Sequence, residues 1–370
     1  MKIAILTLPL HTNYGGILQC YALQTILHNM GHDVKILTKP QYGFSYYWIY
    51  PLSICKRLIK RYVLNKENVD ILRAPHEIIR RNTDKFIKQY IHQYKCRNWT
   101  TNISNKFDVI VVGSDQIWRP EYSQPIEYAF LSFLVNTDIK RISYAASFGV
   151  DYCEYTDEQK KVCSSLLKKF DAISVRELSG VNLCYKNFGV KAVQVLDPTL
   201  LLSADDYRVL VNKVDTELSK GNMLVYIIDK TEEKIALVNR IASDKGLIPF
   251  WLDSPDDQNE NFPLKERVKM SVEQWLKSFD DAEFIFTDSF HGCIFSIIFR
   301  KQFLAIGNKQ RGLDRFISLL EQFSLKERLI LSSNEYEKKM PLINYNKLQG
   351  KLSILQKQSI LFLKTNLLKI

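Results

Sequence analysis

Short apolar runs alternate with amphipathic stretches along most of this chain. KIAILTL (residues 2–8) is almost continuously apolar, HTNYGG (11–16) provides a turn, and ILQCYALQTILHNMG (17–31) has the apolar spacing of a helix. HDVKILT (32–38) then predicts a second strand. A strand that is apolar on both sides is typical of a sheet covered by helices on both faces. The unit therefore predicts parallel strands joined by a right-handed helical crossover.

The same pattern continues and starts again after about residue 200. Strands are predicted within 107–112, 140–146, 171–175, 191–196, 222–229, 247–253, 283–287 and 302–307, and helices within 155–170, 176–189, 231–246, 271–282, 293–301 and 311–325. The two series predict an α/β fold with two Rossmann-like domains facing across a cleft, a GT-B-like arrangement of parallel sheets flanked by helices. We place the domains at 1–200 and 201–345, with a basic helical insertion at about 41–100 and a C-terminal amphipathic helix at 346–370. The boundary is expected near Asp197–Pro198.

Composition narrows the class of protein. The 370 residues are 46% hydrophobic and 25% charged, which suits a globular protein of two domains, and no apolar run is long enough to cross a membrane. The apolar start is interpreted as a buried first strand rather than a signal peptide. The seven cysteines form no CxxC pair, which favours a reducing, cytoplasmic location. His28 and His32 stand four apart on a predicted helix end, but the six histidines otherwise lack close metal-ligand spacing, so we predict no metal site.

Positive charge is concentrated in one segment. Of the net charge of +11, residues 56–97 contribute +8, from 12 Lys/Arg and 4 Asp/Glu. This segment is interpreted either as a surface for anionic membrane or a phosphorylated substrate, or as the solvated face of ordinary helices. No nucleic-acid-binding module is recognisable. The amphipathic C-terminal helix is expected to dock across both domains, with peripheral contact at a membrane as the alternative.

Polar residues and glycines follow the predicted strands of the first domain. Asn13, Gly15 and Gly16 open a helix, where the backbone can approach an anion, with a tight turn as the structural alternative. GSDQIW (113–118) follows VIVV, so Gly113 permits a sharp turn and Ser114, Asp115 and Gln116 present polar groups. Asp115 is predicted to orient a sugar hydroxyl or to act as a base, with a helix cap as the structural alternative.

Cationic groups follow other strands. Arg176 is expected to bind carboxylate or phosphate through two hydrogen bonds, or else to pair with Glu177. His291, in DSFHG, suits proton transfer, and Gly292 frees the backbone beside it. The alternative for His291 is a hydrogen-bonded core histidine. Lys309 and Arg311, in GNKQRG, are a second candidate cationic pole. The GxxxxGK[ST], HExxH and GxSxG patterns are absent, which disfavours P-loop kinases, zinc proteases and common serine hydrolases.

Six segments together resemble one family. NYGGILQCYALQTILHNMGHDV, VVGSDQIWRP, ISYAASFG, ISVRELSG, VLDPTLLL and TDSFHGCIFSIIFRKQFLAI occur in the order expected of polysaccharide pyruvyl transferases. The resemblance implies a GT-B-like bacterial enzyme of capsule or exopolysaccharide biosynthesis. Such an enzyme transfers the enolpyruvyl group of phosphoenolpyruvate to a sugar, forming a pyruvate ketal and releasing phosphate. The acceptor is expected to be linked to polyprenyl diphosphate at the inner membrane face, and no cofactor is expected.

The resemblance also implies roles for individual residues. Arg176 matches the family's arginine in its RE segment, and His291 matches the histidine of its HG motif and is the expected general acid. Asp115 is expected to hold or deprotonate the acceptor hydroxyl. Some members carry an arginine where this chain has Ser289, so either another residue, such as Lys309 or Arg311, supplies that anion contact or the donor is held differently. A nucleotide-sugar glycosyltransferase and an inactive scaffold protein are the alternative functions.

Overall fold

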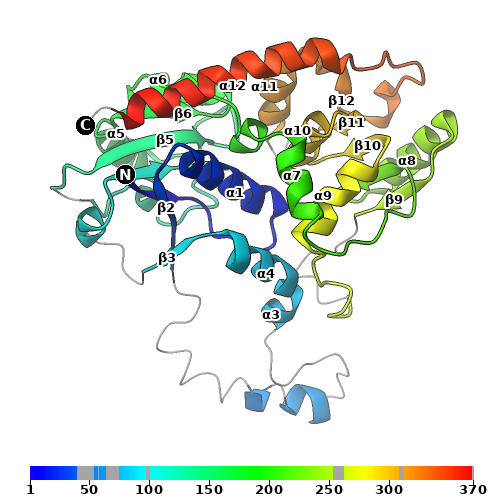
Figure 1. Ribbon diagram of the computed structural model, residues 1–370, viewed down its shortest axis with the longest axis horizontal. Coiled ribbons are helices and arrows are strands. Elements are labelled where there is room, and N and C mark those ends of the chain that lie inside the picture. Colours follow the sequence, from blue (N-terminus) through cyan, green and yellow to red (C-terminus); the bar gives the residue numbers. More distant parts are fainter. Residues whose placement is uncertain are drawn as a thin grey trace.

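Two parallel sheets and their flanking helices form the protein. The computed structural model describes residues 1–39, 54–56, 58–63, 75–96, 101–134, 136–252, 262–307 and 312–368. Figure 1 shows the first sheet and the second side by side, with the last helix, α12 (Tyr345–Leu367), passing over both. This confirms the predicted fold class of two Rossmann-like domains.

The first sheet has the strand order β3-β2-β1-β4-β5-β6-β7, and its recorded strand pairs are all parallel. Its strands are β1 (Lys2–Leu6), β2 (Asp33–Thr38), β3 (Gln93–Lys95), β4 (Val109–Val112), β5 (Lys140–Ala146), β6 (Ala172–Val175) and β7 (Val193–Gln194). Its helices are α1 (Tyr14–Asn29), α3 (Pro75–Ile79), α4 (Arg81–Tyr90), α5 (Asp157–Leu167) and α6 (Leu178–Phe188). The order reverses between β1 and β4, and ligands of such sheets bind beyond the carboxyl ends of the strands at that reversal.

The second sheet has the order β12-β11-β10-β8-β9 and is also parallel in its recorded pairs. Its strands are β8 (Met223–Tyr226), β9 (Pro249–Trp251), β10 (Phe284–Thr287), β11 (Gln302–Ile306) and β12 (Leu329–Ile330). The remaining helices are α7 (Ala204–Val211), α8 (Glu232–Lys245), α9 (Val272–Asp281), α10 (Phe290–Ile298) and α11 (Leu313–Phe323). Here the order reverses between β8 and β10, so the residues that follow β10 lie at the second reversal point.

One apolar core connects the two domains. It runs from Ile3 and Leu18 in the first domain to Trp275 and Phe295 in the second. At the junction the ring of Tyr14 stacks on that of Trp275 with centroids 5.5 Å apart. Such ring pairs are favourable beyond the area that they bury, so the domains are joined by packing as well as by the chain.

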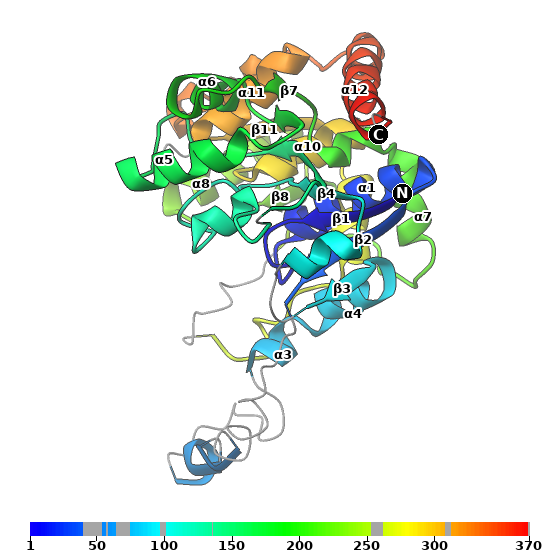
Figure 2. The same cartoon turned by 90° about the vertical axis from the view of Figure 1, so that its left-hand side faces the viewer.

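The helix α12 docks across both domains, as predicted. At its start the Tyr345 hydroxyl donates to the backbone oxygen of Ser296 in the second domain. Farther along, the Ser359 hydroxyl accepts a hydrogen bond from the backbone N–H of Leu196, and Gln356 donates to the Leu200 carbonyl. Figure 2 views this helix nearly end-on, above the sheets.

The sequence analysis did not predict the helix α7, and two further features differ from its prediction. The stretch 41–100 was predicted as a helical insertion, yet Gln93–Lys95 is an edge strand, β3, paired with β2; the rest of that stretch lies partly outside the described residues. The helix α10 begins at Phe290, so His291 lies in its first turn rather than before it. Among the described residues no helix is both long and apolar enough to span a membrane.

Candidate active site

Three residues that the sequence predicts as functional meet where the domains join. Asp115 follows β4, Arg176 follows β6, and His291 comes from the second domain in the first turn of α10. All three are at least nine-tenths buried. The side chain of Asp197, which lies just before the 3₁₀ turn Pro198–Leu201, contacts two of them.

Arg176 is held by carboxylates on two sides. Its Nε donates to Glu177 Oε1 at 2.8 Å and its Nη1 donates to Asp197 Oδ2 at 2.9 Å. Burial acts to lower the pKa of Arg176, but Glu177, Asp197 and Asp115 outweigh burial and raise it. Its Nη2 lies 3.9 Å from Asp115 Oδ1 and makes no hydrogen bond to any described residue, although it is buried. A buried donor of this kind is costly unless a ligand supplies an acceptor.

The carboxylates that hold Arg176 are themselves fixed. Asp197 Oδ1 accepts from the backbone N–H of Thr199 at 3.0 Å and from its hydroxyl at 2.6 Å. Burial acts to raise the pKa of Asp197, yet His291 and Arg176 lower it overall. The Ser147 hydroxyl donates to Glu177 Oε1 at 2.9 Å. The Arg176 guanidinium is therefore set in one position before any ligand arrives.

His291 crosses from the second domain to the start of α1. A Cβ added to Gly15 would lie 2.0 Å from His291 Nδ1, so only glycine leaves room for the ring. Its Nε2 is 3.8 Å from Asp197 Oδ2 and has no hydrogen-bond partner among the described residues. Burial lowers the pKa of His291, while Asp197 and Asp115 oppose that shift. An imidazole whose charge depends on neighbouring carboxylates is suited to gain a proton when an anion binds beside it.

Asp115 lies in a tightly constrained turn. The Gly113–Ser114 peptide bond is cis, and Asp115 has a left-handed φ of 64°. Gly113 has a φ of 134°, and a Cβ there would lie 2.0 Å from the Tyr144 carbonyl oxygen. The Ser114 hydroxyl donates to the Ala145 carbonyl oxygen. The Ser114 side chain is therefore bonded within the turn, whereas Asp115 faces the junction. A Cβ on Gly16 would lie 3.5 Å from Asp115 Oδ2.

The other predicted residues have local structural contacts. The Asn13 side chain caps α1 by accepting from Gly16 N, and the Ser289 side chain caps α10 by accepting from Gly292 N. A Cβ on Gly292 would lie 2.2 Å from Thr287 Oγ1, so this glycine permits close packing of α10 on β10. The side-chain oxygen of Gln116 is buried without a hydrogen-bond partner among the described residues.

The sequence analysis missed two residues of the site, Asp197 and Arg315. Asp197 was interpreted as a domain boundary, although an Asp-Pro at the end of a strand is also a common cap. Arg315, in the first turn of α11, was assigned only to the predicted helix within 311–325. Its guanidinium lies 5.6 Å from the Phe290 ring centroid, and that of Arg176 lies 4.4 Å from the same ring.

Lys309 and Arg311 lie outside the described residues. Within the ranges that the structure describes, no group of three or more His, Cys, Asp or Glu side chains could hold a metal ion.

Comparison with known proteins decides the family. The family model for polysaccharide pyruvyl transferases matches residues 13–310, which is most of the chain and includes Asp115, Arg176 and His291. The chain belongs to the polysaccharide pyruvyl transferase family. It is thus a member of a transferase family, as the order of its motifs predicts. Among curated proteins no relative matches.

Solved structures bear on the fold of this family member. UDP-GlcNAc 2-epimerase from Neisseria meningitidis, solved with UDP-GlcNAc, is similar with a TM-score of 0.51 and 10% identity, covering 100% of both chains. The UDP-GlcNAc 2-epimerase from Methanocaldococcus jannaschii has a TM-score of 0.48 and 13% identity over 96% of this chain and 93% of its own. At such low identity the first likeness concerns the two-domain fold alone, and the second carries no argument.

Proposed function

We propose that this family member transfers the enolpyruvyl group of phosphoenolpyruvate to a sugar, forming a pyruvate ketal and releasing phosphate. One observation carries the proposal. The buried Arg176 Nη2 and His291 Nε2 lie at one junction and make no hydrogen bond within the described residues. A cationic donor for the phosphate beside an imidazole that can carry a proton is the pairing that protonation of an enol phosphate requires.

The reaction balances with His291 as the acid. One sugar hydroxyl adds to the carbon that bears the phosphate, while the terminal vinyl carbon gains a proton from His291 and becomes a methyl group. A second hydroxyl then attacks the same carbon, and the bond between that carbon and the bridging phosphate oxygen breaks. Of the two hydroxyl protons, one replaces the proton that His291 gave and the other leaves with phosphate. Asp115, facing the same junction, is the proposed acceptor of a hydroxyl proton.

Phosphoenolpyruvate carries two anionic groups, so a second cation is needed. Arg315 is our candidate, because it shares the Phe290 ring with Arg176. Burial and the nearby charge of Arg176 lower the pKa of Arg315 to about 10. Two guanidinium groups this close repel each other, and a bound anion relieves that repulsion. Arg315 would thus provide the contact that is lost where this chain has Ser289.

The location of the reaction is also a proposal. A sugar linked to polyprenyl diphosphate would present the acceptor at the inner face of the membrane, and the +8 balance of residues 56–97 suits an anionic surface. In this proposal the protein acts in the cytoplasm and contacts that surface peripherally.

Ligand-dependent thermal stability and phosphate release test the function together. Phosphoenolpyruvate should raise the melting temperature, because a ligand that binds only the folded state stabilises it. His291→Asn and Arg176→Met should each abolish phosphate release with a lipid-linked sugar acceptor. Stabilisation by UDP-sugars alone would reject the proposal. If the wild type releases no phosphate with any acceptor and no ligand stabilises it, an inactive scaffold is the better description.

A nucleotide-sugar glycosyltransferase is the second candidate. The fold likeness to an epimerase solved with UDP-GlcNAc is the observation that favours it. Fold does not fix function, because the same two-domain scaffold carries different sites. The comparison of phosphoenolpyruvate with UDP-sugars separates the two candidates in one experiment.

A further inference from the structure

The helix α12 carries an apolar stripe on its exposed side. Ile354, Leu361 and Leu368 are 59%, 62% and 80% exposed and stand seven residues apart. Seven residues make almost two helical turns, so these side chains follow one line of about 21 Å along the helix. Single exposed leucines are common on protein surfaces. Three large apolar residues at this regular interval form a narrow seam of the kind by which one helix packs on another.

The stripe takes no part in docking α12 on the two domains. Leu348, Leu352, Leu363 and Leu367 are buried against the domains. Each of them stands two or six positions from a member of the stripe, which places it on the opposite side of a helix with 3.6 residues per turn. The helix is therefore apolar on two sides, and the described part of the chain covers one of them.

A row of lysines runs beside the stripe. Lys357 and Lys364 stand three residues after Ile354 and Leu361, and both lysines are exposed. Neither lysine forms an ion pair with a described residue. The helix contains two further lysines and no Asp or Glu. Its exposed face thus combines an apolar row with a positive row.

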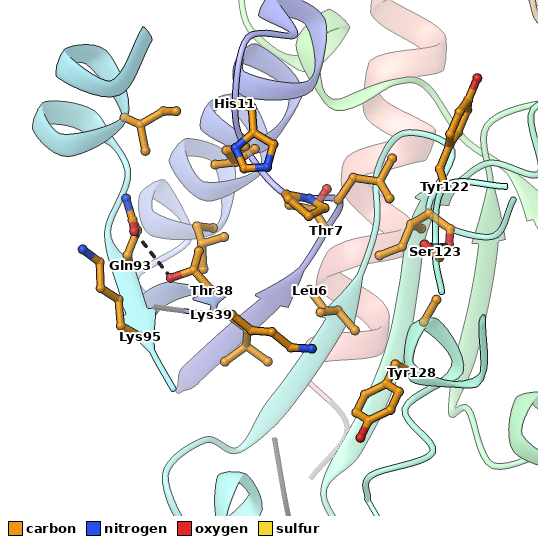
Figure 3. Close-up of a pocket in the computed structure, with 18 of the residues that line it drawn as sticks. Leu6, Thr7, His11, Thr38, Lys39, Gln93, Lys95, Tyr122, Ser123 and Tyr128 are labelled. Atoms are coloured by element: carbon orange, nitrogen blue, oxygen red, sulfur yellow. Dashed lines mark hydrogen bonds between the residues drawn. The ribbon is translucent and has the colours of Figure 1, made fainter. Parts of the chain in front are cut away.

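This face lies away from the places where substrates are expected. The largest cavity of the described chain, about 680 Å³, is lined in part by Asp84 and Lys88 of α4, and no residue of α12 lines it. Figure 3 shows Lys39, Gln93 and Lys95 on its wall. Figures 1 and 2 place α12 at one end of the molecule and α3 at the other. A bilayer that contacts the α3 end would not reach the exposed face of α12.

The shape and charge of the face select its occupant. A helix that lies in a bilayer buries a broad apolar side, whereas this stripe has one apolar residue for every two turns. A second copy of this chain would bring two lysine rows together, and like charges across a helix pair repel. A helix with one apolar row and flanking carboxylates would cover the stripe and pair with Lys357 and Lys364.

We propose that the exposed face of α12 binds an amphipathic helix of a partner protein, one whose apolar row is flanked by Asp or Glu. Ile354, Leu361 and Leu368 pack against the apolar row, and Lys357 and Lys364 pair with the carboxylates. This surface is separate from the proposed active site, so the inference stands or falls independently of the transfer reaction.

Fluorescence anisotropy with designed peptides tests this chemistry. The probe is a labelled helical peptide of about 21 residues, long enough to span the stripe. It has leucine at every seventh position and glutamate on both sides of each leucine. Two matched peptides replace the glutamates by lysine or the leucines by serine. The acidic peptide should bind at least about tenfold more tightly than either of them, and more weakly as ionic strength rises.

Charge reversal assigns the binding to α12. Lys357→Glu/Lys364→Glu should lose roughly tenfold or more in affinity for the acidic peptide and should gain affinity for the lysine peptide. Lys161→Glu/Lys168→Glu makes the same change in net charge at exposed lysines on and beside α5, which Figure 2 shows away from α12. This control should bind the acidic peptide as the wild type does. Equal loss of affinity in the two variants overturns the proposal, as does a wild type without preference for the acidic peptide.

Replacing the apolar row separates the possible occupants. Ile354→Ser/Leu361→Ser should lose the acidic peptide, yet keep the melting temperature of the wild type, because both side chains are exposed. Co-sedimentation with vesicles of phosphatidylglycerol and phosphatidylcholine, and sedimentation velocity of the protein alone, complete the test. If the wild type binds these vesicles or dimerises and this variant does neither, a membrane or a second copy occupies the face and the proposal is wrong.

Discussion

Replacing Asp197 by Asn separates the charge of this buried carboxylate from its shape. The amide oxygen of Asn can still accept from Thr199, which preserves the cap. The change removes the negative charge that faces Arg176 at 2.9 Å and His291 at 3.8 Å. Two effects should follow: a loss of stability, and a change in how the junction binds an anion.

The size of the stability effect can be worked from the geometry. At 2.9 Å and an effective dielectric constant of about 20, the attraction between Asp197 and Arg176 is roughly 6 kcal/mol before desolvation. Breaking a buried ion pair typically costs about 3–5 kcal/mol. Arg176 keeps Glu177 at 2.8 Å, so we expect the lower end, about 3 kcal/mol. With an unfolding entropy of about 2.1 cal/mol/K per residue, this lowers the melting temperature by about 4 °C.

A second ion pair supplies the control. Arg208 binds Asp280 through two hydrogen bonds of 2.8 and 3.0 Å, but its side chain is 42% exposed. Asp280→Asn should therefore cost about 1 kcal/mol or less. Differential scanning fluorimetry of both variants, with and without phosphoenolpyruvate, makes the comparison. If Asp197→Asn has the same melting temperature as Asp280→Asn and responds to phosphoenolpyruvate like the wild type, Asp197 does not hold Arg176 and His291 as proposed.

Four other predictions concern the same junction. Burial lowers the pKa of His291 below its ordinary value of about 6.5, so protonation of this residue opposes folding. The free energy of unfolding should therefore fall as pH drops through that value. His291→Asn should flatten this loss in thermal melts from pH 8 to pH 5. A bound phosphate favours the charged imidazole, so phosphoenolpyruvate should bind more tightly as pH falls toward 6. Calorimetry in two buffers measures the proton uptake on binding. Equal uptake by His291→Asn contradicts the assignment of His291 as the group that gains the proton. Gly15→Ala should displace the His291 ring and reduce phosphate release by roughly 100-fold or more. Gly350→Ala is the control, because a Cβ added there meets no atom within 4 Å. It should stabilise α12 by about 0.5–1 kcal/mol and leave activity intact. Arg315→Met should weaken phosphoenolpyruvate binding by about tenfold or more, as measured by titration, and unchanged binding removes Arg315 from the donor site.

Most of the fold could be predicted because the strands are short apolar runs followed by glycine or polar turns. VIVV before GSDQ, and FIFT before DSFHG, identify both a buried strand and its functional end. The edge strand Gln93–Lys95 escaped because three residues with polar ends have no apolar pattern to detect. Strand pairing there depends on the neighbouring β2, which is a tertiary effect.

The arrangement of the site could be predicted only in part. Its members Asp115, Arg176 and His291 were identified at strand ends, where parallel sheets gather ligands. The contact of His291 with Gly15 joins residues 276 positions apart, and no local pattern encodes it. Asp197 acts through the side chains that it holds, so its importance depends on distances that a sequence does not contain.

The path of α12 has a consequence for how the protein is made. Its distal half completes the first domain: Ser359 and Gln356 bond to the backbone there, and Leu363 is fully buried. Ribosomes deliver these residues only after both sheets have been synthesised, and domains tend to fold as they emerge. The apolar surface of the first domain that α12 covers therefore stays exposed while the second domain is translated. That nascent surface is where we expect a chaperone to bind, and where a stalled ribosome would leave an aggregation-prone product.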